Sequence, residues 1–268
     1  MPSGDVRFDN GAREYAAYLL TPEGRLRADL AFANLVDFLP ERDANRPLHA
    51  LDVGCGTGAT AIRLAGLGLQ VTGLDSSAAM LNLAEAAAAE AGVANRLTLR
   101  QGDATELAHL IGAASFDVVL CHNVLEYVDD PVAVLRAMAG ALKDESAMLS
   151  IVLRNRFGEV LKAALQAGDL AAAEANLTAK WGFESLYGGQ VRLFTSADIE
   201  AMLDAASLTS IAARGIRTVA DYLPRTVSRD TEYARILELE RELGRRPELA
   251  EIARYLQCIA RPAGERAA

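Results

Sequence analysis

Hydrophobic and polar positions alternate in blocks through the middle of the chain, and the blocks predict strands that are each followed by a helix. Apolar segments of strand length occupy residues 48–53, 70–75, 96–103, 116–124 and 147–155. Segments with helical periodicity and end signals lie between them at 59–68, 77–93 and 131–143. Strands that alternate with helices in this way form a parallel sheet with right-handed crossover connections.

The pattern changes on both sides of this central region, so we expect four parts in one fold. Residues 1–46 are polar and helix-prone and are predicted to form an N-terminal helical cap, ahead of a cofactor-binding core at 47–155. Residues 156–195 are helical and then polar with glycines, which favours a lid or insertion. Residues 196–268 return to the core with a helix at 195–208, strands at 209–219 and 252–261, and a charged helical insertion between these strands at 230–246. The prediction is a Rossmann-like α/β fold whose seven-stranded, mostly parallel sheet ends in a C-terminal antiparallel hairpin.

The composition allows one large domain and limits its partners. A chain of 268 residues with 51% hydrophobic content can bury one sizeable core. Its formal net charge of −9 argues against a general polyanion-binding surface, so any contact with nucleic acid would be local. The three cysteines form no CxxC pair, so neither a disulfide framework nor a metal site is predicted. An acidic N-terminal segment and the lack of a long apolar run predict a cytoplasmic protein without a signal peptide or membrane span.

Three glycines at alternate positions follow the first predicted strand, in LDVGCGTGAT (51–60), and this spacing indicates that a ligand approaches the backbone closely. A dinucleotide, a nucleoside triphosphate and S-adenosylmethionine (SAM) would each require such a loop. The chain contains no Gly-Lys dipeptide, which excludes a P-loop. Gly54, Gly56 and Ala59 satisfy the GxGxxA pattern of dinucleotide-binding proteins, with Asp75 at the spacing of a ribose-binding acid. The loop alone therefore leaves a dinucleotide and SAM open.

Polar side chains at the ends of the other strands narrow this choice. Asp52 lies just before the loop, where it can order the loop or face a cationic cofactor, and Asp103 can accept a hydrogen bond from an adenine amino group. His122 and Asn123 follow the fourth predicted strand. We expect these side chains to face one site, because the carboxyl ends of parallel strands form the ligand crevice of such sheets. None of the tyrosines is followed four residues later by a lysine, which counts against a short-chain dehydrogenase.

Several motifs together resemble those of known methyltransferases. LDVGCGTG, GLDSSAAML, GDA and FDVVLCHNVLEYVDDP are similar to the motifs of class I SAM-dependent methyltransferases, over about residues 48–155. RFDNGAREYAAYLLTPEGRLRADL near the N-terminus and GIRTVADYL, YARILELE and ARYLQCIAR near the C-terminus extend the likeness over most of the chain. These segments resemble the bacterial tRNA 5-carboxymethoxyuridine carboxyl-methyltransferases, which methylate the carboxylate of a modified wobble uridine.

The resemblance implies SAM as the cofactor and S-adenosylhomocysteine as its product. In this interpretation Arg27 contacts the methionyl carboxylate, Asp75 the ribose hydroxyls and Asp103 the adenine. The predicted cofactor-binding residues are Arg27, Asp52, Gly54, Cys55, Gly56, Asp75, Ser76, Met80, Asp103, Ala104 and His122.

The expected reaction is O-methylation of a carboxylate, with the anticodon region of tRNA as the partner. A carboxylate is ionised at neutral pH and needs no general base, and guanidinium groups suit its recognition. The acceptor-side candidates are His122, Arg154, Arg192, Arg217 and Tyr222.

A small-molecule acceptor is the alternative, because the family's lysine-rich stretch is matched here by LTAKWGFESLYGGQ, in which Lys180 is the only lysine. That acceptor would be a carboxylate or an amine, and an amine would require a base such as His122. A nicotinamide oxidoreductase and a non-catalytic SAM-binding partner protein are two further classes left open, as is the oligomeric state.

Overall fold

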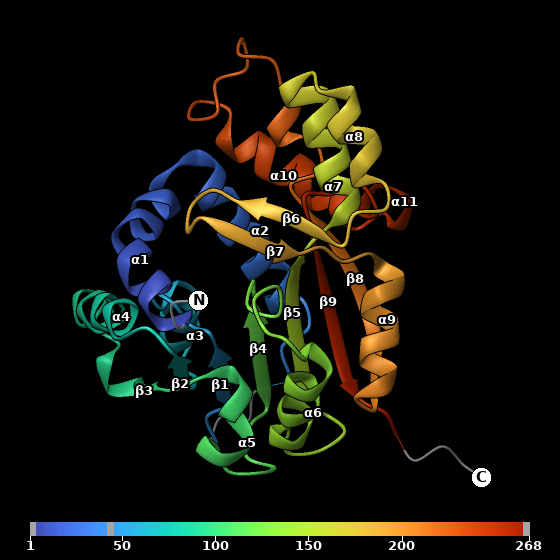
Figure 1. Ribbon diagram of the computed structural model, residues 1–268. Coiled ribbons are helices and arrows are strands. Elements are labelled where there is room, and N and C mark those ends of the chain that lie inside the picture. Colours follow the sequence, from blue (N-terminus) through green and yellow to red (C-terminus); the bar gives the residue numbers. More distant parts are fainter. Residues whose placement is uncertain (1–3, 42–45, 265–268) are drawn as a thin grey trace.

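The sheet has the predicted topology. The computed structural model describes residues 4–41 and 46–264, and seven strands in this part of the chain form one sheet in the order β3-β2-β1-β4-β5-β9-β8 (Figure 1). They are β1 (His49–Val53), β2 (Gln70–Asp75), β3 (Leu97–Gln101), β4 (Val118–His122), β5 (Met148–Arg154), β8 (Leu208–Ile216) and β9 (Tyr255–Pro262). Strands β1 to β5 are parallel, whereas β9 runs antiparallel between β5 and β8. The mostly parallel sheet and its antiparallel C-terminal pair are confirmed.

Helices cover both faces of this sheet because its central strands are apolar on both sides. Leu135 of α6 (Pro131–Ala141) belongs to the cluster on one face, together with side chains of α5 (Leu107–Leu110) and α9 (Ser196–Ala205). Leu64 of α3 (Ala59–Gly66) lies in the cluster on the other face, together with a residue of α4 (Ala78–Glu90). In β1, Leu51 joins the first cluster and Ala50 the second, as the alternation of side chains along a strand requires.

The N-terminal region contains two helices with different surroundings. Helix α2 (Pro22–Val36) belongs to the core, since Leu30 is fully buried and the amide of Asn34 donates to Gln257 of β9 at 3.0 Å. Helix α1 (Gly4–Leu20) lies instead near the carboxyl ends of β1 and β2 and packs against α4 (Figure 1). Of the two N-terminal helices, only α1 therefore covers the edge of the sheet from outside.

Residues 156–193 form an insertion between β5 and α9. Its two ends are adjacent, because Asn155 and Phe194 form an isolated parallel bridge. The insertion contains α7 (Arg156–Leu161), the π-helical turn η3 (Lys162–Ala167), α8 (Leu170–Asn176) and a separate hairpin of β6 (Trp181–Glu184) and β7 (Gly189–Arg192). The sequence pattern predicts the helices but not the hairpin, whose strands have only four residues each.

The connection from β8 to β9 contains η4 (Ala220–Tyr222), α10 (Tyr233–Gly244) and α11 (Pro247–Ala250); η1 (Ala94–Arg96) and η2 (Ala104–Glu106) are single turns elsewhere. The predicted charged helix is α10. Its buried Glu240 accepts hydrogen bonds from the backbone N–H groups of Thr218 and Ala220, both at 2.6 Å, and so fixes the turn that follows β8. No helix among the described residues is long and apolar enough to cross a membrane.

Candidate active site

A cavity of about 520 Å³ lies at the carboxyl ends of the parallel strands. This volume is within the usual range for sites that enclose a small molecule. Nine of the eleven predicted cofactor-binding residues line this cavity: Arg27, Gly54, Gly56, Asp75, Ser76, Met80, Asp103, Ala104 and His122. Asp52 and Cys55 do not line it.

The glycine loop forms the floor of the cavity. Gly54 and Gly56 have φ values of 70° and 53°, which side chains disfavour, and a Cβ on Gly54 would lie 2.2 Å from Val124. The backbone N–H of Gly54 donates to the carbonyl of Leu74 at 2.7 Å, and that of Gly56 donates to the carboxylate of Asp75 at 2.8 Å. The loop is therefore held against the end of β2 with its backbone next to the cavity.

Two strand-end carboxylates stand beside this loop. Asp75 accepts hydrogen bonds from the backbone N–H groups of Gly56 and Ser77, and Asp103 accepts from the N–H and hydroxyl of Thr105 at 2.7 and 2.6 Å. Both carboxylates cap local backbone and also line the cavity. They are thus oriented before any ligand binds.

Asp52 and Cys55 support the loop from beneath. Asp52 is only 3% exposed, and burial, followed by the negative charge of Asp75, raises its pKa to about 7. The buried Cys55 packs against Gly73, where an added Cβ would lie 2.9 Å from its sulfur. Burial likewise raises the pKa of the Cys55 thiol, so this side chain is an uncharged packing group.

Arg27 reaches from α2 into the cavity and meets only neutral groups. Its guanidinium donates to the hydroxyl of Tyr15 at 3.0 Å and to Oδ1 of Asn123 at 3.3 Å. It also lies 5.1 Å from the ring centroid of Tyr18 and 5.7 Å from that of Tyr255. Within the described ranges, no carboxylate lies at ion-pair distance from Arg27. A cation enclosed by neutral groups is a site for an anionic part of a ligand.

His122 at the end of β4 is uncharged. Its Nε2 lies 2.9 Å from the hydroxyl of Ser150, and burial, followed by the charge of Arg27, lowers its pKa to about 3. The adjacent Glu126 accepts hydrogen bonds from the amide of Asn123 and the backbone N–H of Arg154, at 3.0 and 2.9 Å. His122 is therefore a weak base that helps to shape the wall.

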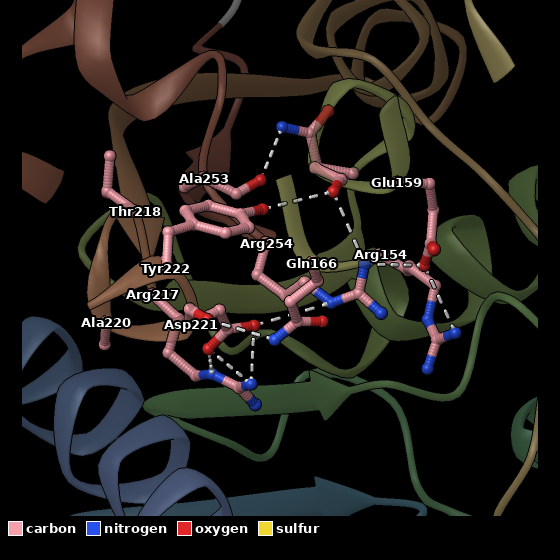
Figure 2. A network of polar contacts seen from close by, with 12 residues as sticks. Arg154, Glu159, Gln166, Arg217, Thr218, Ala220, Asp221, Tyr222, Ala253 and Arg254 are labelled. Atoms are coloured by element: carbon pink, nitrogen blue, oxygen red, sulfur yellow. Dashed lines mark hydrogen bonds and ion pairs between the residues drawn. The ribbon is translucent and has the colours of Figure 1, made fainter. Parts of the chain in front are cut away.

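The far end of the cavity is a network of arginines and carboxylates (Figure 2). Arg217 forms a two-pronged contact with Asp221, at 2.8 and 2.7 Å, and donates to the hydroxyl of Tyr18 at 3.0 Å. Arg254 pairs with Glu159 at 3.0 Å.

Arg154 joins this network from the end of β5. It pairs with Glu159 at 3.4 Å and with Glu184 of β6, so that the insertion is attached to the core through charged contacts. Tyr255 stands among Arg27, Arg154, Arg217 and Arg254, whose charges lower the pKa of its phenol against the opposing effect of burial.

Aromatic side chains from three elements enclose the cavity. Phe8 of α1 meets Tyr127 and Tyr187 edge-on at centroid distances of 5.2 and 5.1 Å, and Tyr15 lies 6.1 Å from Tyr187. The guanidinium of Arg7 is 4.9 Å from the rings of both Phe8 and Tyr127. These side chains form an aromatic cover over part of the cavity.

Two predicted acceptor-side residues lie outside the cavity lining. The hydroxyl of Tyr222 points to the carbonyl of Gly158 at 3.5 Å. Arg192 lies on the hairpin, 4.9 Å from the ring of Trp181, and donates to the carbonyl of Asp129 at 3.1 Å. His122, Arg154 and Arg217 do line the cavity.

Comparison with known proteins identifies the family. A family model described as a methyltransferase domain matches residues 51–150. The tRNA 5-carboxymethoxyuridine methyltransferase of Escherichia coli strain K12 is 30% identical over 259 residues, which cover 96% of each chain. The chain belongs to the family of the tRNA 5-carboxymethoxyuridine methyltransferases.

Other methyltransferases match part of the chain or its fold. A ubiquinone biosynthesis O-methyltransferase of Marinobacter nauticus is 38% identical over 122 residues, which cover 45% of this chain and 50% of that protein. The structure of magnesium protoporphyrin IX methyltransferase from Synechocystis PCC 6803 with bound S-adenosylhomocysteine superposes with a TM-score of 0.61 at 17% identity, covering 96% of this chain and 97% of the other. This last likeness concerns the fold.

The family decides which cofactor the protein uses. The protein is a SAM-dependent methyltransferase, and the oxidoreductase and non-catalytic interpretations are set aside. The residues of the cavity fit this cofactor. Gly54 has no side chain, so the backbone of the loop lies directly next to the cavity. Arg27 offers a cation that has no acidic partner among the described residues.

The sequence did not predict most of the network of arginines and carboxylates at the far end of the cavity. Arg254, Tyr255, Glu159 and Glu184 all line the cavity or pair with its arginines, but none belongs to a motif with a chemical signature. The available signals are the resemblance of ARYLQCIAR to the family and the position of Arg254 and Tyr255 at the start of the last strand, beside the end of β5.

Proposed function

We propose that the methyltransferase esterifies a carboxylate and that its acceptor is the 5-carboxymethoxyuridine of tRNA. The observation that carries the carboxylate is the chemistry of the acceptor end, where guanidinium groups are plentiful and the lining imidazole, His122, is too weak a base to deprotonate an acceptor. An acceptor that is already anionic needs no such base.

The candidates for a base are unsuited to deprotonating an amine. His122 has a pKa of about 3 because burial and the charge of Arg27 disfavour its cationic form. Burial raises the pKa of the phenols of Tyr127 and Tyr187. Tyr255 is surrounded by guanidinium groups, and the same charges that favour its phenolate would make that phenolate a weaker base. The small-molecule amine alternative is therefore disfavoured.

The chain's residues would bind, orient and enclose the reactants. Arg27 would hold the methionyl carboxylate, Asp75 the ribose and Asp103 the adenine. When bound, SAM supplies the methyl group, which leaves sulfur as an acceptor oxygen forms its bond to carbon, so the products are a methyl ester and S-adenosylhomocysteine and no proton moves. A dry, enclosed site favours this reaction because opposite charges are neutralised along its path.

The acceptor carboxylate would lie near Arg217 and Tyr255. The guanidinium of Arg217 is already neutralised by Asp221, so it can orient the acceptor oxygen without withdrawing much of its negative charge. Tyr255 contributes a hydroxyl group at the junction of the cofactor and acceptor ends, near both Arg27 and Arg217.

The tRNA acceptor is supported by the E. coli relative, which is aligned over 96% of the chain. A small-molecule carboxylate is the second candidate, favoured by the acidic net charge of −9. A tRNA acceptor would place the enzyme in the cytoplasm.

The test is to incubate the enzyme with methyl-labelled SAM and tRNA that carries 5-carboxymethoxyuridine, and then to digest the RNA to nucleosides. We expect label on this nucleoside, and mild alkali should remove it as an ester. Label that resists alkali would contradict the esterification. In a parallel incubation a small-molecule extract replaces the tRNA, and label found only in that extract would contradict the tRNA acceptor.

An Arg217→Lys variant serves as the acceptor-side comparison. It keeps the positive charge but loses the two-pronged contact with Asp221. It should lose most turnover while SAM affinity stays within about threefold, whereas equal losses of both would place Arg217 in the cofactor site.

A further inference from the structure

The outer face of the β6–β7 hairpin carries two large apolar side chains that are mostly or half exposed. Trp181 is 48% exposed and Phe183 67% exposed, although both are large apolar residues. Their partners across the strand pair are Arg192 and Gln190, which lie on the same face because directly paired residues share a side of a sheet. The inner face carries Gly182, Glu184 and Val191.

The composition of this outer face matches surfaces that bind unpaired nucleotides. Exposed aromatic rings stack on nucleobases, and a guanidinium can stack on a base or contact a phosphate. Arg192 lies 4.9 Å from the ring centroid of Trp181 and covers one side of the indole, and nearly half of the Trp181 side chain remains exposed. Lys180 beside it is also exposed.

The outer face is continuous with the mouth of the cavity. Phe183 lines the cavity while it is mostly exposed, so its ring lies at the rim. The hairpin is held there from inside, because Arg154 pairs with Glu184 and donates to the carbonyl of Phe183 at 3.4 Å. A polymer whose reacting nucleotide enters a cavity of about 520 Å³ must continue past this rim.

We propose that the outer face of the hairpin, formed by Trp181, Phe183, Gln190 and Arg192, stacks with unpaired bases next to the acceptor nucleotide of an RNA. This inference rests on the proposed function, in which the acceptor belongs to tRNA. Stacking needs no strongly positive surface. It is therefore compatible with a chain of net charge −9, in which LTAKWGFESLYGGQ contains a single lysine.

The single tryptophan of the chain makes the contact directly measurable. Titration of the wild-type enzyme with an anticodon stem-loop RNA should quench the fluorescence of Trp181, because a stacked base changes the environment of the indole. Free 5-carboxymethoxyuridine nucleoside, which has no neighbouring bases, should leave the emission unchanged.

Activity assays give the second measurement. Trp181→Ala and Phe183→Ala should each raise the KM for tRNA by about 5- to 150-fold, the range expected for the loss of one stacked base. Turnover at saturating tRNA, SAM affinity and methylation of the free nucleoside should stay unchanged in Trp181→Ala, because Trp181 does not line the cavity. Ile211→Ala is the matched control, since Ile211 is 40% exposed on the edge strand β8 and is not among the residues that line the cavity.

Two results would overturn the inference. One is unchanged fluorescence and an unchanged KM for tRNA in the variants while the wild type methylates tRNA, which leaves the proposed function intact. The other is a dimer that dissociates on Trp181→Ala in sedimentation, which assigns the face to a second copy of the chain. Quenching by the stem-loop in an enzyme that transfers no methyl group to tRNA would instead support the surface and contradict the acceptor.

Discussion

At the residue scale, Arg27 and Asp52 are two charged groups whose surroundings differ from those of ordinary surface residues. Arg27 has neutral partners and faces the cavity, whereas Asp52 is buried beneath the glycine loop. We therefore expect Arg27 to affect the affinity for the anionic group of the ligand, and Asp52 to affect how protein stability depends on pH.

Arg27→Gln should remove the enzyme's preference for SAM over decarboxylated SAM. In the wild type, the hydrogen-bonded pair between the guanidinium and the ligand carboxylate should contribute about 1.5–3 kcal/mol, which only SAM can gain. Calorimetry with both ligands measures this preference. Arg25→Gln on the same helix is the control, because Arg25 is exposed and outside the cavity lining. A preference that persists in Arg27→Gln would assign the methionyl carboxylate to another residue.

Asp52→Asn should change how the stability of the ligand-free enzyme depends on pH. Burial raises the pKa of Asp52 to about 7, so between about pH 4 and pH 7 the folded protein keeps a proton that the unfolded chain releases. The stabilisation is therefore complete below about pH 4 and is lost as the pH rises through 7.

The amide in Asp52→Asn cannot ionise, so this variant does not lose stability in the same way as the pH rises. Its free energy of unfolding, measured with a denaturant, should rise relative to the wild type by about 2 kcal/mol between about pH 5 and about pH 7. Parallel profiles for the two proteins would show that Asp52 titrates normally.

At the element scale, α1 is connected to the cofactor site by a contact at its N-terminal half. The carboxylate of Asp9 accepts hydrogen bonds from the hydroxyl of Ser77 at 2.5 Å and the backbone N–H of Ala79 at 3.0 Å, at the start of α4. The hydrogen bond from Ser77 lowers the pKa of Asp9. Phe8 and Tyr15 of the same helix cover the cavity, so this contact helps to hold the cover in place.

Asp9→Ala should accelerate SAM dissociation several-fold, because the cover would open more often. Stopped-flow displacement measures this rate. Glu14→Ala, an exposed change on the same helix, should leave it unaltered. A dissociation rate that is the same in both variants would show that α1 does not limit cofactor release.

At the scale of the whole molecule, the insertion and the core have separable tasks. All predicted SAM contacts lie outside the insertion, on α2 and at or after the strand ends, whereas residues 156–193 supply Glu159, Glu184 and the hairpin. The backbone N–H of Arg156 donates to the carbonyl of Phe194 at 2.8 Å, so the ends of the insertion already touch.

Replacing residues 157–193 by a short glycine linker should therefore give a folded protein that keeps SAM affinity within about tenfold but transfers no methyl group. Calorimetry and the labelled-tRNA assay measure the two properties. Loss of SAM binding in a protein that still unfolds cooperatively would show that the insertion belongs to the cofactor site.

The sequence by itself determined the central sheet and the cofactor loop. The strands of the core, the glycine loop and the strand-end acids Asp75 and Asp103 could be predicted because they depend on short-range rules: side-chain periodicity, backbone conformations open to glycine, and the shared edge of parallel strands. The β6–β7 hairpin escaped prediction because its short strands carry no clear periodicity.

Only the tertiary structure decided the acceptor end. Arg217 meets Tyr18 across 199 residues of sequence, and Asn155 meets the carbonyl of Ala253 across 98. Contacts of this kind depend on how β5, β8 and β9 are ordered in the sheet, which no local pattern encodes. For the same reason the sequence grouped Arg192 and Tyr222 with Arg217, whereas packing turns both away from the cavity and brings Arg254 and Tyr255 to it.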